Sequence, residues 1–139
     1  MKRLVLVLVV ACAAPPAARP PAAPAPPPAP LPLDRDLPAL ARRTLALYEA
    51  TAQLLSSGVS CADATVQLGS LRTAHAADLA ARATVIAEAR TPALQIALDA
   101  HAGSLGAAAS AILGAPLMKT CAPDRAFTDA YEVLFGAQP

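Results

Sequence analysis

Apolar residues recur at steps of three and four after residue 36, which is the spacing of one face of an α-helix. The first run predicts a helix from Asp36 to Leu55, with Asp36 as the N-cap, Pro38 in the first turn and Gly58 as a left-handed stop. The inward positions of this helix are Leu37, Leu40, Thr44, Leu47, Thr51 and Leu54.

The same spacing predicts three further helices. The second opens at Ser60, which with Asp63 resembles a capping box, and the third restarts at Thr91, which caps it, with Pro92 in the first helical position. A shorter fourth helix covers 123–135. The inward positions are Leu68, Leu71, His75, Leu79, Arg82 and Ile86 on the second helix and Leu94, Leu98, His101, Leu105, Ala108 and Ile112 on the third.

Composition supports an all-α fold. Hydrophobic residues make up 55% of the chain and aromatic residues only 3%, and alanine, the best helix former, supplies much of the apolar content. Strand-forming residues do not cluster after residue 33. Because short loops make consecutive helices antiparallel, we expect residues 34–139 to form a four-helix up-down-up-down bundle.

Cys61 and Cys121 are predicted to form a disulfide. In the antiparallel arrangement the second and fourth helices run in the same direction, so these two residues meet at one end of the bundle. The chain holds three cysteines, and the other one lies in the N-terminal leader. The alternative, two free thiols binding a metal, has no CxxC motif and no nearby histidine to complete a site.

The N-terminus has the pattern of an export signal. Lys2 and Arg3 precede an unbroken apolar run over 4–10, which is too short to span a bilayer, and Ala11 is the small residue expected before a cleavage site. Export places the protein in an oxidising compartment, where disulfides persist.

The segment Val9-Val10-Ala11-Cys12 resembles the lipobox of bacterial lipoproteins, usually Leu-Ala/Ser-Gly/Ala-Cys, although Val9 and Val10 depart from it. The resemblance implies that residues 1–12 are a lipoprotein signal ending in Cys12, the lipidated first residue of the mature chain. Ala13, which is not Asp, then favours the outer membrane. The alternative is ordinary cleavage after Ala13, which would discard Cys12.

Residues 13–33 form a Pro/Ala-rich tether. Ten prolines lie in 15–32, and proline lacks the N–H that helices and sheets need. We expect disorder or polyproline II, reaching some 50 Å at roughly 3.1 Å per residue. A proline-rich partner motif is the alternative.

Two histidines are the candidate ligands for a cofactor. His75 and His101 both fall on inward positions, but a hairpin turning near residue 91 sets them about 9 Å apart along the helix axis. Each is therefore expected to have a local partner, which for His75 is Asp78. The alternative is a haem- or metal-carrying bundle that uses His75 or His101.

No cofactor is assigned and an enzyme is not expected. The spacing offers no Ser-His-Asp or Cys-His set, no Glu-x-x-His and no phosphate-binding glycine loop. A net charge of +1 without a basic run excludes a nucleic-acid binder. The sequence thus predicts an exported, non-enzymatic envelope protein with a structural or protein-binding role. It is expected to be lipid-anchored, at the outer membrane or facing the periplasm, or else secreted. Its expected partners are the membrane, through the lipid, and an envelope protein.

Overall fold

The structure is a computed structural model that describes residues 29–135, and this part of the chain is all-helical without a strand, which confirms the predicted class. The predicted signal peptide over 1–12, the predicted lipidation site Cys12 and most of the predicted tether lie outside the described residues. The helices are α1 (Leu37–Leu55), α2 (Cys61–Ala74), α3 (Ala76–Ala87), α4 (Thr91–Asp99), α5 (Ala102–Gly114), α6 (Pro116–Thr120) and α7 (Arg125–Phe135).

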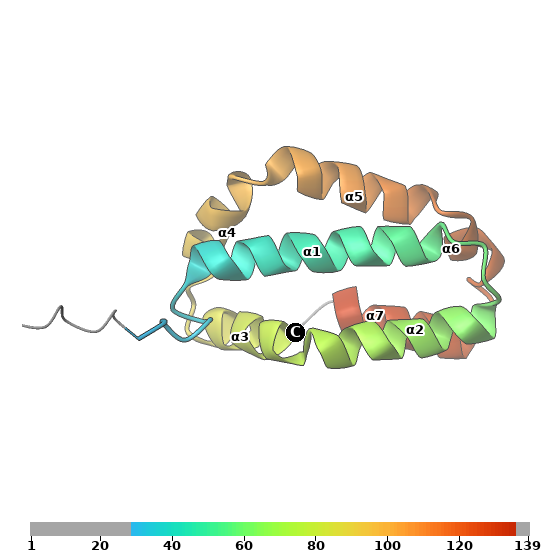
Figure 1. Ribbon diagram of the computed structural model, residues 1–139, viewed down its shortest axis with the longest axis horizontal. Coiled ribbons are helices and arrows are strands. Elements are labelled where there is room, and N and C mark those ends of the chain that lie inside the picture. Colours follow the sequence, from blue (N-terminus) through green and yellow to red (C-terminus); the bar gives the residue numbers. More distant parts are fainter. Residues whose placement is uncertain (1–28, 136–139) are drawn as a thin grey trace, which may run out of the picture.

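The helices are arranged around α1. Figure 1 shows α4 and α5 along one side of α1, and α2 and α3 along the other. α7 packs lengthwise on α2, and α5 packs on α1. With 11 residues, α7 is much shorter than α1 with its 19 residues.

The start of α1 follows from its capping residues. The Asp36 carboxylate accepts the N–H of Ala39 at 3.0 Å, and Pro38 lies in the first turn, where its missing N–H costs nothing. Beyond the last turn, Gly58 has a φ of +71°, as predicted for a left-handed stop. Both ends of this helix are therefore determined by nearby residues that can be recognised in the sequence, namely Asp36 and Pro38 at the start and Gly58 after the end.

The second and third predicted helices are not continuous, so the prediction of four unbroken helices is wrong. The second breaks at His75, between α2 and α3, and the third breaks between α4 and α5, which meet at 93°. His75 has φ −104° and ψ 16°, and His101 has φ −118° and ψ 12°. Both pairs of angles lie near the bridge region, so the backbone departs from helical values at these two residues, neither of which is glycine or proline.

Two predicted helix starts also need correction. Thr91 is the first residue of α4 rather than its cap, so Pro92 stands at the second helical position. α7 begins at Arg125 rather than at residue 123, because the Asp124 carboxylate accepts the N–H groups of Ala126 and Phe127 at 2.9 and 3.3 Å. Asp124 is thus an unpredicted N-cap.

The sixth helix was not predicted either. Pro116 is the first residue of α6, directly after Ala115. Proline is well suited to that position, because its fixed φ matches the helix and its missing N–H has no partner there. The same residue therefore ends α5 and opens the turn of helix that leads to Cys121.

The buried apolar side chains form two clusters. The larger, here called the distal core, combines the second half of α1 with α2, α6, α7 and Ile112 of α5. The smaller, the proximal core, consists of Leu40, Ala81, Val85 and Leu94. Within the described part of the chain, no buried side-chain nitrogen or oxygen lacks a hydrogen-bond partner, so the polar groups between the clusters are satisfied.

Candidate functional site

Cys61 and Cys121 are joined by a disulfide, as predicted. Cys61 is the first residue of α2, and Cys121 follows α6, three residues before the cap of α7. Cys121 is fully buried in the distal core, against which Cys61 packs. The alternative in which both thiols are free to bind a metal is therefore wrong, because their sulfur atoms are bonded to each other.

His75 belongs to a polar cluster at the break between α2 and α3. Its Nδ1 lies 2.8 Å from Oδ2 of Asp78, the local partner expected from the sequence. The other oxygen of Asp78, Oδ1, accepts a hydrogen bond from Nη1 of Arg43 on α1 at 3.1 Å. The Asp78 side chain is 6% exposed, so a nearly buried carboxylate is held by one group at the α2–α3 break and by another on α1.

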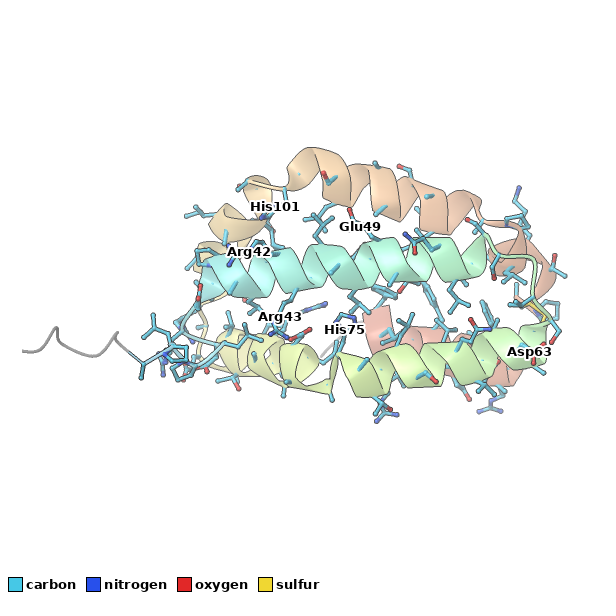
Figure 2. The ribbon with its side chains drawn as sticks, viewed as in Figure 1. Arg42, Arg43, Glu49, Asp63, His75 and His101 are labelled. Atoms are coloured by element: carbon cyan, nitrogen blue, oxygen red, sulfur yellow. A yellow bond between two sulfur atoms is a disulfide. The ribbon has the colours of Figure 1, made fainter. Side chains whose placement is uncertain are left out.

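His101 lies at the other break and has no comparable partner. Its side chain is partly buried, and it makes no side-chain hydrogen bond or ion pair within residues 29–135. Figure 2 shows His101 beside α4 and α5, and His75 between α1 and the α2–α3 break. The two histidines are therefore separated by α1 itself, and not merely by the helical register that the sequence suggested.

The ligand set of a metal centre is not found in the part of the chain that the structure describes. There, no group of three or more His, Cys, Asp or Glu side chains is placed to hold a metal ion. The carrier function based on His75 or His101 stays a prediction. His75 is paired with Asp78, and Figure 2 shows His101 on the other side of α1 from His75.

An apolar cavity of about 440 Å³ lies between α1, α3, α4 and α5. Large aliphatic side chains from three helices form much of its wall. Arg82, from α3, is the one charged residue that lines it. The lining residues are Thr44, Tyr48, Arg82, Ile86, Thr91, Leu94, Gln95, Leu98, Leu105, Gly106 and Ala109.

The bend between α4 and α5 explains this cavity. α4 packs on α1 in the proximal core through Leu94, and α5 packs farther along α1 through Ala108 and Ile112. At the bend the wall between these contacts is made of partly buried Leu98 and Leu105. The helix on the opposite side of α1 that reaches this region is α3, which supplies Arg82 and Ile86.

The aromatic residues of α7 mainly close the distal core. Phe127 is 2% exposed, and the ring of Phe135 contacts those of Tyr48 and Tyr131, with centroids 4.9 and 5.2 Å apart. Burial, and to a lesser extent the neighbouring Tyr48 hydroxyl, raises the pKa of Tyr131 above its usual value of 10.0.

Several large apolar side chains remain on the surface. Val66 on α2, Ile96 on α4 and Leu113 on α5 are each at least 70% exposed. Among residues 29–135, no helix alone combines the length and apolar character needed to cross a membrane; α4 and α5 reach both only when taken together across their 93° bend.

A comparison of the chain with protein-family models, with curated proteins and with solved structures finds no match.

Sequence reasoning identified the disulfide and the His75–Asp78 pair but not the cavity. The sequence feature that could have indicated the cavity is Arg82, a charged residue at an inward position of the second predicted helix. A cation at such a position marks either a pairing site or a lined cavity, and the structure places it in the wall of a cavity.

Proposed function

We propose that this protein is exported and held at the cell envelope by a lipid on Cys12, where its helical domain has a non-enzymatic, protein-binding or structural role. The observation that carries the proposal is the buried Cys61–Cys121 disulfide. Such bonds persist in exported proteins and are rare where thiols are kept reduced. The export pattern over 1–11 supports the same compartment independently.

The chain's layout supports the tethered arrangement. The Pro/Ala-rich segment joins the domain at the N-terminal end of α1, and the last tether residues that the structure describes, up to Pro32, are exposed. A semi-rigid spacer leaving one end of the domain holds it away from an anchor. This spacing is useful to a domain that must reach a partner in the envelope.

The proposal includes a simple description of the fold. We treat α1, α2 with α3, α4 with α5, and α7 as four rods of an up-down-up-down bundle, two of which are broken. The chain direction visible in Figure 1 supports this description, since α1 and α5 run one way and α2, α3 and α7 the other.

Lipidation is tested in a bacterial host by metabolic labelling with an alkyne-bearing palmitate and by membrane fractionation. The wild-type chain is expected to be labelled and to sediment with membranes, and Cys12→Ser to be unlabelled and released. The matched control is the Cys61→Ala/Cys121→Ala double variant, which changes two other cysteines and should keep its label. Labelling of Cys12→Ser, or an unlabelled wild type, would overturn the anchor.

The binding role is tested by site-specific photo-crosslinking in the envelope. The photoreactive residue replaces Val66, Ile96 or Leu113, which are exposed apolar positions on three different helices. We expect a discrete crosslinked species from one of these positions and none from the exposed polar controls Ser70 and Thr84. If all five positions give the same pattern, the proposed partner surface is wrong.

A further inference from the structure

We propose that the apolar cavity between α1, α3, α4 and α5 is a binding site for a single-chain amphiphile with an anionic head, of the fatty-acid class, whose carboxylate pairs with Arg82. The inference does not depend on the export or anchoring proposed above. It rests on the size of the cavity, on the character of its wall and on the pairing of the arginines around it.

The size and wall of the cavity suit a small apolar ligand. Its volume of about 440 Å³ falls in the range of roughly 300–1,000 Å³ that is usual for small-molecule sites. Ile86, Leu94, Leu98 and Leu105 come from three helices and surround the space with aliphatic groups. An acyl chain placed there removes its own apolar surface and that of these side chains from water.

Arg82 is the residue that is proposed to bind the anionic head group of the ligand. Three neighbouring arginines have acidic partners: Arg43 pairs with Asp78, and Arg35 and Arg90 both pair with Glu88. Arg82 is partly buried, yet it makes no salt bridge in the part of the chain that the structure describes. No acidic residue lines the cavity. An anion is therefore the head group that complements this site.

Two of the four uncharged polar side chains in the wall, Thr44 and Gln95, already have hydrogen-bond partners. The Thr44 hydroxyl donates to the carbonyl of Leu40 at 2.9 Å, and the Gln95 amide donates to Asp99 at 2.9 Å. A single cation beside a wall with four large aliphatic side chains fits a ligand with one charged end and one long apolar end. A sugar or nucleotide would need many more unoccupied polar groups.

The dimensions favour such a ligand over a protein segment. A two-turn helix about 10 Å wide and about 11 Å long has roughly twice the volume of the cavity. A helix from a partner or from a second copy of this chain would therefore not enter it. An extended acyl chain is narrow enough to lie between α1 and the bend of α4 with α5.

Gly106 offers a direct test of the cavity. It lines the wall, and a Cβ added to it meets no atom within 4 Å. Gly106→Leu would place a side chain in the space that the ligand needs, and leucine favours helix more than glycine does. Gly103 on the same helix is equally open but does not line the cavity, so Gly103→Leu is the matched control.

The measurement is isothermal titration of the full chain carrying Cys12→Ser, which excludes competition from an acyl group on residue 12. The protein is delipidated first and the probes are kept below their micelle concentrations. Dodecanoate is the probe, and dodecanol and dodecyltrimethylammonium are its neutral and cationic counterparts. We expect dodecanoate to bind with 1:1 stoichiometry and about tenfold more tightly than dodecanol, the usual scale for a charged hydrogen bond.

Three variants complete the test. Gly106→Leu should abolish binding, and Gly103→Leu should leave it unchanged. Arg82→Gln should remove the preference for dodecanoate over dodecanol, whereas Arg42→Gln, which removes an exposed arginine outside the cavity, should keep it.

Unchanged binding in Gly106→Leu would overturn the site, and so would equal affinity of the wild type for dodecanoate and dodecanol. Retention of the preference in Arg82→Gln would overturn the role of this arginine. If Gly106→Leu did not fold, the comparison of Arg82→Gln with Arg42→Gln would still decide the charge selection, because it leaves the aliphatic wall intact.

Discussion

Oδ1 of Asp78 lies 3.1 Å from Nη1 of Arg43, so a carboxylate on α3 is bonded to a cation on α1. The same carboxylate also holds His75 at the break between α2 and α3. Asp78 thus connects three parts of the chain. The contact joins α1 to α3 by a polar bond, in addition to their apolar packing in the proximal core.

Replacing Asp78 by Ala is expected to lower the free energy of unfolding by about 2 kcal/mol, because a nearly buried carboxylate with two charged or polar partners is lost. Urea unfolding of the oxidised protein measures this change. Asp99→Ala is the control: Asp99 is exposed and bonded only to Gln95 on its own helix, so its effect should stay within about 0.5 kcal/mol. Equal effects of the two substitutions would contradict the role given to Asp78.

The raised pKa of Tyr131 predicts a loss of stability in alkali. Burial, and then the neighbouring Tyr48, favours the neutral phenol in the folded protein relative to the unfolded chain, whose tyrosine has a pKa of 10.0. The folded state therefore binds more protons above pH 10, and its stability falls as the pH rises from there. Below that pH this contribution is fully present.

Absorbance at the tyrosinate band checks this directly, because the chain has only two tyrosines. In Tyr48→Phe the one remaining tyrosine is Tyr131, and its titration midpoint should still lie above 10.0, since burial is the larger cause. The midpoint should be somewhat lower than in the wild type, because the Tyr48 charge is gone. A midpoint at or below 10.0 would show that this ring is not buried.

Removing the disulfide should cost about 4 kcal/mol on the chain-entropy model, because the bond closes a loop of 60 residues. The Cys61→Ala/Cys121→Ala double variant is expected to show this loss in urea unfolding, and reduction of the wild type should give a similar one. A change below about 1 kcal/mol would mean that the distal core orders the two chain segments without the bond.

Two residues with positive φ give a matched pair of backbone predictions. Ala89, in the turn between α3 and α4, has φ 55°, and Gly58, in the turn after α1, has φ 71°. The left-handed region costs an L-residue about 1–2 kcal/mol, and part of this is offset by the greater freedom of glycine in the unfolded chain.

Ala89→Gly should therefore raise the free energy of unfolding by about 0.5–1 kcal/mol, and Gly58→Ala should lower it by a similar amount. Thermal unfolding monitored by circular dichroism measures both. Added side-chain atoms meet nothing within 4 Å at Gly58, so the backbone alone accounts for its effect. Shifts of the same sign in the two variants would contradict this explanation.

The features that the sequence predicted correctly depend on short-range chemistry. Asp36 caps α1 because a carboxylate three residues before an amide reaches it, and Ser60 accepts the N–H of Asp63 at 3.1 Å for the same reason. The disulfide followed from helix order and from the number of cysteines. His75 and Asp78 are three residues apart, so their pairing also followed from helical spacing.

The helix breaks were missed because nothing local marks them. Neither His75 nor His101 is flanked by a proline, and the residue directly before each of them is alanine, the best helix former. At His75 the break accompanies a bond from Asp78 to Arg43 on another helix, which is a tertiary contact. The cavity depends in turn on the 93° bend at the second break, so sequence periodicity alone could not reveal it.

The position of the disulfide has a consequence for proteolysis. The exposed turn at residues 88–89 lies inside the covalent ring that Cys61 and Cys121 close. A protease that cuts this turn opens the ring without releasing either fragment, because the disulfide still joins the piece bearing α1 to α3 to the piece bearing α4 to α7. Shedding of the C-terminal helices thus takes two separate events, cleavage of the backbone and reduction of the sulfur bridge.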